Sequence, residues 1–536
     1  MVPLPRRRPA TAVVLTLALG LAALPGPAAA AAPEFPVGWE GYHTYAETVA
    51  DIAAVEAAHP DIVTRFSIGK SYQGRDIWVV KISDNVAVDE NEPEVMYDGA
   101  IHSDEHMTHE MMLRTIHWLA DGYAGDARIR SIVDSREIWV IPMVNPDGVE
   151  YDIAGRKFHY WRKNRQPNAG SAYIGTDLNR NFDYRWGGGG RTSSNPQAIT
   201  YRGPSAFSAP ETRAYADFVR SRYVDGRQQI RAHITFHEAG RLVMWPYGYT
   251  MTNLPGDMTR DDFNALVKIG KTMAASNGYR PQQASDLYVT SGTARDWLYG
   301  RYRIFSYTFE MSVKDYPDDS MIGPETNRNR EAVLYLAERA WCPLSVLGAT
   351  VMNARCGAYD DDLEVTKGWR VNPDGTDTAT AGGWQRGVAQ ATSYLGARQL
   401  TAAPTGQSSF ATGLLAGAST SANDLDGGRT TALSPTISLP AATGQRLTFR
   451  WSFAHYASAT SADELRVEVV ADDGTATTVH LVQGAPVDRD GLWTNASISM
   501  DPWAGQTIRL RFSATDGAGD GLVEAAFDDV RVTRPS

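Results

Sequence analysis

Two side chains that can bind a metal ion lie three positions apart, at His102 and Glu105. They follow the short run Tyr97–Ile101, and a strand that ends there and leads into a helical turn can aim side chains i and i+3 at one point. A second apolar run, Ile234–Phe236, ends at His237, which places a third donor at the end of a neighbouring strand. Two histidines and one glutamate, with a fourth position left for water, are the ligands of a hydrolytic zinc ion.

Other metal-binding side chains crowd the same segment. His106, His109 and Glu110 follow Glu105 closely and can pair in other ways. Neither His-Glu dipeptide of the chain continues to the second histidine of an HExxH zinc helix. A lone His-x-x-Glu also occurs in solvated and helix-capping segments, so the metal-site prediction depends on motifs further along the chain.

Three such motifs follow in order. They are Trp161-Arg162-Lys163-Asn164-Arg165, Asp177-Leu178-Asn179-Arg180-Asn181-Phe182-Asp183 and Tyr307-Thr308-Phe309-Glu310. Together with the three candidate ligands, they resemble the zinc carboxypeptidases of the carboxypeptidase A family, from about Tyr42 to about Trp341. The resemblance implies an α/β fold with a mixed, mostly parallel sheet flanked by helices. It also implies one zinc ion per chain on His102, Glu105 and His237, and hydrolysis of peptide bonds.

The resemblance also implies how a peptide terminus is bound. Asn179 and Arg180 match the residues that hold the terminal carboxylate, a task suited to the planar, doubly donating guanidinium group. Tyr288 matches the family's mobile tyrosine, which closes over the bound carboxylate. An enzyme with these three residues is expected to be an exopeptidase.

Glu310 and Arg162 are the predicted catalytic side chains. Glu310 ends the apolar run Ile304–Phe309, where a carboxylate needs a functional reason. Beside zinc it can take a proton from the metal-bound water and later deliver it to the leaving amine. Arg162 matches the family's arginine that polarises the scissile carbonyl group and stabilises the oxyanion.

The chain departs from the family pattern at outer substrate positions. Asp104 stands where the family often has arginine, and Ala239 stands where a tyrosine commonly follows the last histidine ligand by two. Neither change removes a metal ligand, the predicted base Glu310, or Asn179 and Arg180, which together form the clamp for the terminal carboxylate. Binding of substrate residues beyond the terminal ones is therefore expected to differ.

Arg295 falls where the family places the residue at the floor of the side-chain pocket. A guanidinium group there would pair with a terminal Asp or Glu side chain, and an apolar guest would leave it buried and unpaired. In the alternative interpretation, Asp296, Glu238 or another acid neutralises Arg295 and the pocket stays broad. A preference for acidic C-terminal residues is thus one of two interpretations that the sequence leaves open.

The first residues have the order of a secretory signal peptide, predicted over residues 1–32. Arg6-Arg7-Arg8 precedes an apolar stretch, Ala12–Leu24, and small residues follow. That stretch is too short for a membrane anchor, so we expect a secreted, extracellular protein. The net charge is −11, and acidic and basic residues are interspersed along the chain. The sequence therefore shows no basic cluster of the kind that binds nucleic acid.

A chain of 536 residues is long enough for two domains. We predict a catalytic domain over 36–345, with helices such as 44–58 and 210–223, and a linker over 346–360. Cys342 and Cys356 are predicted to form a disulfide there, two buried thiols being the alternative. Residues 361–536 show period-two strands with Gly- and Asp-rich turns, which indicate a jelly-roll-like β-sandwich.

The β-sandwich resembles the accessory domains of secreted bacterial hydrolases. A polysaccharide or other surface ligand is its expected partner, and Asp528 and Asp529 are candidates for binding Ca²⁺ or for solvated strand ends. For the whole chain we expect a secreted carboxypeptidase acting on peptides or proteins. One alternative is a cell-wall-peptide or glutamyl-tail hydrolase of the same fold. The other is a catalytically inert surface-binding protein.

Overall fold

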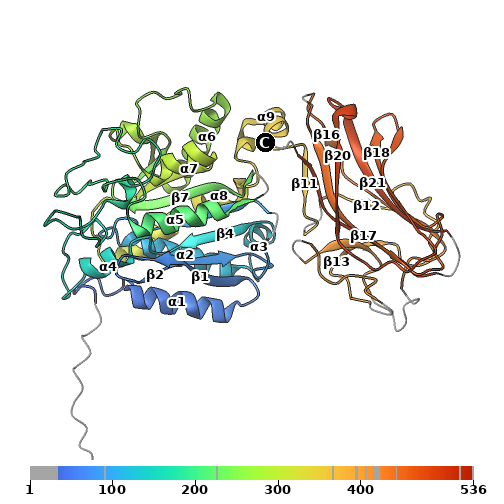
Figure 1. Cartoon of the computed structure of the whole chain (residues 1–536), viewed down its shortest axis with the longest axis horizontal. Helices are drawn as coiled ribbons and strands as arrows, with labels where there is room; N and C mark the ends of the chain where they lie inside the picture. Colours follow the sequence, from blue (N-terminus) through green and yellow to red (C-terminus); the bar gives the residue numbers. More distant parts are fainter. Residues whose placement is uncertain are drawn as a thin grey trace, which may run out of the picture.

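The computed structural model describes residues 34–89, 92–224, 227–364, 367–392, 396–404, 407–415, 423–441, 443–517 and 521–533. The predicted signal peptide lies outside these residues. Figure 1 shows an α/β domain, coloured blue to yellow, beside a β domain coloured orange to red. Within the described residues, no helix is both long and apolar enough to cross a membrane.

The α/β domain is built on an eight-stranded sheet with the order β1-β2-β4-β3-β7-β10-β8-β9. The strands are β1 (Val63–Lys70), β2 (Asp76–Ile82), β3 (Glu94–Asp98), β4 (Glu137–Ile141), β7 (Ile230–Glu238), β8 (Leu242–Trp245), β9 (Arg280–Gln283) and β10 (Phe305–Met311). The central strands β4, β3, β7 and β10 are parallel, and antiparallel pairs occur toward both edges. This confirms the predicted mixed, mostly parallel sheet.

Helices cover both faces of the sheet. Tyr97 and Asp98 are successive residues of β3, so their side chains point to opposite faces. Tyr97 donates a hydrogen bond to α8, and Asp98 accepts one from Tyr215 on α5. The helices of the α/β domain are α1 (Tyr45–Ala58), α2 (Met107–Gly122), α3 (Ala127–Val133), α4 (Pro146–Asp152), α5 (Pro210–Ser221), α6 (Arg260–Asn277), α7 (Ala294–Tyr302) and α8 (Ile322–Arg339).

Two predicted helix boundaries were slightly wrong. Thr44 caps α1 from outside, since its side chain accepts from the Glu47 amide in a reciprocal capping box. The second helix ends at Ser221, and Tyr223 begins the short strand β5 (Tyr223–Val224), which pairs with β6 (Arg227–Gln228).

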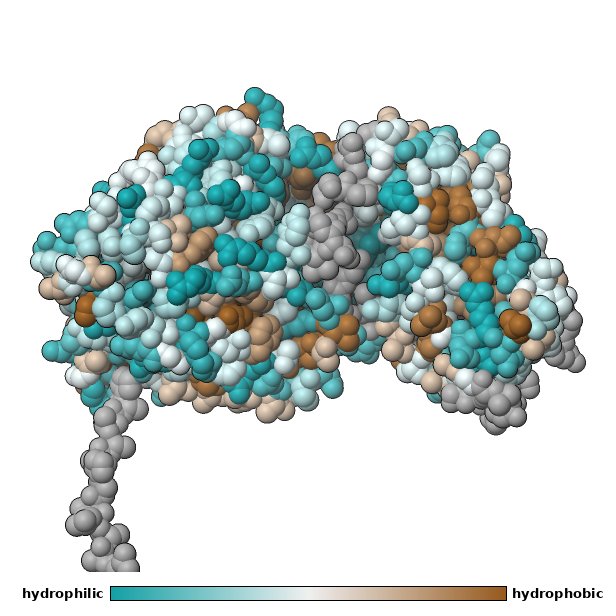
Figure 2. Space-filling model, in the orientation of Figure 1, coloured by the Kyte–Doolittle hydropathy of each residue, from teal (hydrophilic) through white to brown (hydrophobic). Residues whose placement is uncertain are grey.

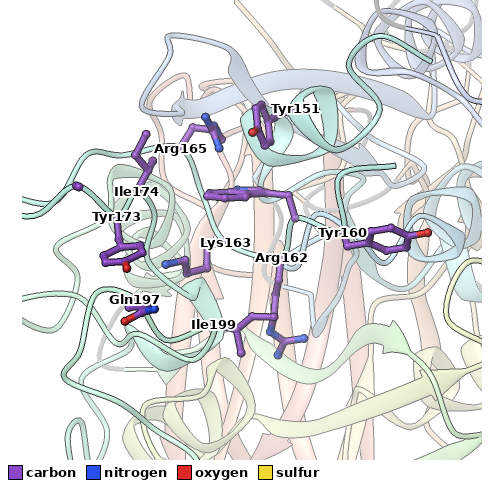
Figure 3. A pocket seen from close by; sticks show the side chains of 11 residues that line it. Tyr151, Tyr160, Arg162, Lys163, Arg165, Tyr173, Ile174, Gln197 and Ile199 are labelled. Atoms are coloured by element: carbon purple, nitrogen blue, oxygen red, sulfur yellow. The ribbon is translucent and has the colours of Figure 1, made fainter. Parts of the chain in front are cut away.

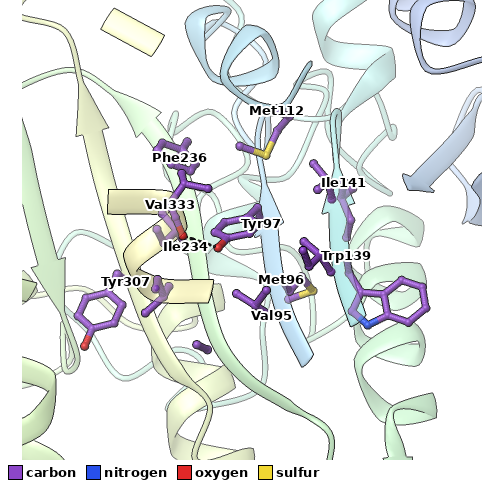
Figure 4. Packing of buried hydrophobic residues seen from close by; sticks show 14 of the residues in the cluster. Val95, Met96, Tyr97, Met112, Trp139, Ile141, Ile234, Phe236, Tyr307 and Val333 are labelled. Carbon is purple, nitrogen blue, oxygen red and sulfur yellow. Dashed lines mark hydrogen bonds between the residues drawn. The ribbon is translucent and has the colours of Figure 1, made fainter. Parts of the chain in front are cut away.

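The core of the α/β domain lies between the sheet and α2 and α8. Figure 4 shows Tyr97 among Met112, Ile234 and Val333, with its hydroxyl bonded to the Val333 carbonyl at 2.8 Å. β3 and β4 are buried along their whole lengths, as expected for parallel strands covered on both faces. The ends of these strands are therefore held rigidly.

The C-terminal domain has two antiparallel sheets, as expected for a β-sandwich. One has the order β13-β14-β22-β17-β20 with β11 on β22, and the other β12-β15-β21-β18-β19 with β16 on β21. Their strands are β11 (Tyr359–Asp361), β12 (Arg370–Val371), β13 (Trp384–Gly387), β14 (Ser409–Thr412), β15 (Gly428–Leu433), β16 (Ile437–Ser438), β17 (Arg446–His455), β18 (Glu464–Ala471), β19 (Ala476–Gln483), β20 (Thr494–Ser499), β21 (Thr507–Asp516) and β22 (Val523–Thr533). The alternating apolar residues of β17, β18 and β21 point into the core between the sheets.

The two domains have separate hydrophobic cores that share no buried residue. Between them lies α9 (Ala349–Arg355), beside the disulfide that joins Cys342 and Cys356. The described polar contacts across the boundary include Gln407 to the Asp84 carbonyl and Asn353 to the Ser438 carbonyl. In the view of Figure 2, both domains present a mainly hydrophilic face with scattered hydrophobic residues.

Because the cores are separate, a chain that ends at Gly357 should fold. We expect its α/β domain to melt within a few degrees of the corresponding transition in the full chain, as followed by circular dichroism. Loss of the cooperative transition in the shortened chain would show that the β-sandwich is part of the same folding unit.

Candidate active site

The three predicted metal ligands meet at one end of the sheet. His102 and Glu105 lie in the loop between β3 and α2, and His237 is the second-last residue of β7, which pairs in parallel with β3. The Nδ1 atoms of the two histidines are 3.0 Å apart. Glu105 oxygens lie 2.7 Å from His102 Nδ1 and 2.8 Å from His237 Nδ1. All three side chains are buried.

The outer nitrogens of both imidazoles have acceptors that orient the rings. His102 Nε2 lies 3.2 Å from Asp177 Oδ1, and His237 Nε2 lies 3.3 Å from the Thr235 hydroxyl. Thr235 donates its own proton to Asp98, so its oxygen is free to accept from the ring. The Asn179 amide nitrogen also lies 3.3 Å from His237 Nε2. In the tautomer that carries its proton on Nε2, each ring directs its Nδ1 lone pair to the same point as Glu105.

This donor set fits zinc, since two neutral imidazoles and one carboxylate converge and leave one side open to the cavity. A zinc ion bound there would supply a Lewis acid and lower the pKa of bound water to about 7. Burial opposes ionisation of Glu105, but the two histidines hold the pKa of its carboxyl group far below the usual range.

The competing histidines of the same segment are committed elsewhere. His106 Nε2 lies 2.9 Å from Asp152, and Glu110 lies between His109, at 3.3 Å, and His43, at 3.0 Å. They therefore belong to separate polar contacts, away from the converging ligands.

A second group of three acids among the described residues could also be read as a metal site: Asp89, Glu94 and Glu137. Arg222 contacts all three of them, and Lys81 lies 2.7 Å from Glu137. Because these two cations already form ion pairs with the acids, this group is a partly buried ion-pair network.

Glu310 lies directly beside the metal ligands. In the parallel pair β7 and β10 it is the register partner of His237, and it lines the same cavity. Burial, followed by the charge of Glu105, raises the pKa of Glu310 to about 8. A carboxyl group with that pKa can accept a proton and return it near neutral pH.

Arg162 and the terminal-carboxylate residues share one buried acid, Asp177, whose role the sequence analysis missed. Asp177 contacts His102, Arg162 at 3.3 Å and, more distantly, Arg180 at 3.9 Å. Although burial opposes ionisation, the two guanidinium groups hold the pKa of Asp177 far below its usual range. The only signal in the sequence was an acid two positions before Asn179, next to Leu178.

The residues predicted to bind the substrate terminus are held by main-chain contacts. Arg180 donates from Nε to the Arg191 carbonyl and from Nη1 to the Asn179 carbonyl, both at 2.8 Å. Asn179 accepts from the Ala294 amide at the start of α7, and the Arg191 guanidinium lies 4.9 Å from the Tyr288 ring centre. These contacts fix the clamp before any substrate enters.

All of the predicted ligands, catalytic residues and substrate-binding residues line a single cavity of about 240 Å³. They are His102, Glu105, Arg162, Asn179, Arg180, His237, Tyr288, Arg295 and Glu310. Buried Arg295 donates from Nε to Asp296 at 3.1 Å and from Nη1 to the Thr308 hydroxyl at 3.0 Å. The structure therefore contains the pairing with Asp296 that the alternative interpretation required.

A second cavity, of about 390 Å³, borders the first and shares Arg162 with it. Figure 3 shows Tyr151, Tyr160 and Tyr173 around Lys163 and Arg165 in this cavity. It gives room for substrate next to the group predicted to hold the scissile carbonyl oxygen.

Comparisons with known proteins agree with this geometry. A sequence model of the zinc carboxypeptidase family matches residues 48–332. The chain is 46% identical over 322 residues to a zinc carboxypeptidase of Saccharothrix mutabilis subsp. capreolus, a match covering 59% of this chain and 74% of that protein. It is 32% identical over 282 residues to carboxypeptidase A2 of Mus musculus, covering 51% and 63% respectively.

Among solved structures, the crystal structure of carboxypeptidase A from Helicoverpa armigera matches with a TM-score of 0.50 and 27% identity. That match covers 56% of this chain and 73% of the other. The chain thus belongs to the zinc carboxypeptidase family, and its α/β domain is that of a zinc-dependent hydrolase of peptide bonds.

Removal of a ligand and removal of the base should have separable effects. His237→Ala should lose both zinc and activity, because two protein ligands remain. Glu310→Gln should retain zinc and lose kcat by about a hundredfold or more, because only proton transfer is impaired. Metal analysis and steady-state kinetics distinguish the two, with a substitution of the exposed Glu331 side chain of α8, Glu331→Gln, as the control. Stoichiometric zinc in His237→Ala would contradict the ligand set.

Proposed function

We propose that the protein is a secreted metallocarboxypeptidase that removes C-terminal residues from peptides and proteins. The observation that carries this proposal is the single cavity in which the converging ligands, Glu310 and the Asn179-Arg180 clamp lie together. Secretion is proposed from the charge pattern of the first residues.

In the proposed reaction, Asn179 and Arg180 bind the terminal carboxylate and Tyr288 encloses it. Arg162 holds the oxygen of the scissile carbonyl group, and its contacts with Glu105 and Asp177 keep the guanidinium in place. Glu310 takes the proton from the attacking water and passes it to the leaving amine.

The alternatives are weaker on physical grounds. An inert binding protein has no need of a buried, oriented set of ligands beside a carboxyl group of raised pKa. Hydrolysis inside a cell-wall peptide would not use a clamp for a free carboxylate. A glutamyl-tail substrate is compatible with the same cavity and differs only in its terminal residues.

The exopeptidase proposal predicts dependence on the free terminus. Amidation of the peptide C-terminus should lower kcat/KM by at least about a hundredfold, since the charge-assisted bonds to Arg180 are lost. The measurement compares acid and amide forms of one acetylated peptide. Equal rates would favour an endopeptidase and overturn the proposal.

For the terminal side chain, we propose a preference for Asp and Glu. Arg295 in the cavity lining supports it, and Arg180 in the same lining and Arg191, which lies over the Tyr288 ring, add positive charge. Asp296 offsets part of this charge, although its carboxylate also accepts from the Gly248 and Tyr249 amides. The expected preference is therefore modest, about tenfold over an apolar residue.

This preference is tested by comparing kcat/KM for peptides that end in Glu, Phe and Lys. Arg295→Ile should reverse the order of Glu and Phe, whereas Arg295→Lys should keep it, because it retains the positive charge. Zinc content and melting temperature show whether the variants remain folded around the unpaired Asp296. An original enzyme that already prefers Phe or Lys would contradict the assignment.

For the β-sandwich, we propose a surface or polysaccharide ligand from its resemblance to accessory domains. Calcium there also stays a prediction. Asp528 is fully buried and its Oδ2 has no hydrogen-bond partner among the described residues, but burial, followed by the charge of Asp529, raises the pKa of Asp528 well above its usual range, so a cation would have to displace a proton there. Asp529, by contrast, lies 3.1 Å from Arg531, so the calcium prediction rests on Asp528 alone.

A further inference from the structure

The cavity of about 390 Å³ that borders the active site contains two cations without a partner acid. Arg162, Lys163 and Arg165 line it, and no aspartate or glutamate is among its described lining residues. Arg162 is paired with acids of the active site. Within the described part of the chain, no carboxylate forms an ion pair with Lys163 or Arg165. The cavity therefore carries positive charge that the described residues leave uncompensated.

The guanidinium group of Arg165 is held between two aromatic rings. It lies 3.5 Å from the centre of the Tyr151 ring and 4.4 Å from that of the Trp161 ring. Its Nε and Nη1 atoms are buried and have no hydrogen-bond partner among the described residues. Stacking on the rings fixes the group, which stays charged at neutral pH, but it does not replace the hydrogen bonds of the planar donors. Such a group favours a ligand that can accept from it.

Lys163 adds a second cation to the same cavity. Its Nζ donates to the Pro196 carbonyl at 2.9 Å, which leaves the other two protons of the ammonium group for a ligand. Burial lowers the pKa of Lys163 and of Arg165, as expected for cations that leave water without a partner acid. Asp177 and Asp147 act on these cations only electrostatically, and both already form ion pairs with other arginines. A carboxylate from a ligand would supply the missing negative charge.

This cavity lies on the side of the active site where the substrate residues before the scissile bond can continue. It shares with the active-site cavity only Arg162, the group assigned to the scissile carbonyl oxygen, and it contains none of the residues assigned to the peptide terminus. In Figure 3, Lys163 points toward Tyr173 and Gln197, and Arg162 points away from them. Each residue of an extended peptide advances about 3.3 Å, so the second and third residues before the scissile bond can reach past Arg162 into this cavity.

We propose that Arg165, assisted by Lys163, selects an aspartate or glutamate side chain at the second or third residue before the scissile bond. The carboxylate accepts from the guanidinium group of Arg165, and the charge of Lys163 adds to the attraction. Tyr173 and Ile199, which line the same cavity, give the methylene groups of the substrate side chain an apolar surface. This inference rests on the proposed exopeptidase function and names a substrate class for it, peptides with an acidic residue shortly before the C-terminus.

The test uses two series of peptides that share the terminal residue the enzyme cleaves best. In acetyl-Gly-X-Gly-terminus and acetyl-X-Gly-Gly-terminus, X is Glu, Gln or Lys, and Glu and Gln differ in charge but hardly in size. In at least one series, kcat/KM should be about tenfold higher for Glu than for Gln, and lowest for Lys. The advantage of Glu should shrink at high salt, as expected for a charge interaction at a partly open site. Equal rates for Glu and Gln in both series, or a preference for Lys, overturn the proposal.

Variants assign the effect to the two residues. In Arg165→Gln the ratio of kcat/KM for Glu to that for Gln should fall toward one, whereas Arg165→Lys should keep part of it because the charge remains. Lys163→Gln leaves the stacked rings intact and should lower the same ratio about threefold, so it serves as the test if the Arg165 variants do not fold. Lys271→Gln removes an exposed positive charge from α6 and should keep the original ratio.

The outcomes separate this inference from the proposed function. An unchanged ratio in every folded, zinc-loaded variant of Arg165 and Lys163 overturns the assignment to these residues. If no peptide loses its terminal residue, the proposed exopeptidase function fails, and this inference fails with it. Cleavage of the Glu and Gln peptides at equal rates rejects only this inference.

Discussion

β7 pairs in parallel with β3 on one side and with β10 on the other, and this pairing brings the metal ligands and the catalytic carboxyl group together. Residues that are more than 70 positions apart become neighbours because Glu310 is in register with His237, and Thr235 is in register with Asp98. A shift of one residue in either pair would turn the ligand or the base to the opposite face of the sheet. The buried core around β3 makes such a shift costly, so the fold and the site are specified by the same contacts.

Buried carboxylates hold the site in its working geometry. Asp177 fixes His102 and Arg162, and Asp98 fixes Thr235, which in turn contacts His237. Such groups are stable only where donors surround them. Asp98 shows this clearly, because it also accepts from Tyr215 and contacts His233. The polar network beneath the ligands is therefore complete, which favours a single orientation of each imidazole ring.

The sequence predicted the strands and the type of reaction better than it predicted which side chains contact one another. Apolar runs that end in His or Glu indicated the strands, and the ordered motifs indicated the family and the residues of the cavity. The role of Asp177 and the contact between Asp98 and Thr235 were missed, because they depend on which strands are adjacent. The pairing of Arg295 with Asp296 was left open, since two neighbouring residues on a helix can point to different partners. The end of α5 at Ser221 was missed because the next residues pair as strands.

Positive charge gathers in the cavity where the proposed substrate binds. Arg162, Arg180 and Arg295 line it together with the metal ligands and Glu310. In a largely enclosed cavity such charges are weakly screened, so they orient a substrate before it touches the reacting groups. A peptide whose negatively charged C-terminus enters first matches this field. Reversed, it would bring its positively charged N-terminus toward the same guanidinium groups, so the arrangement selects the direction of binding.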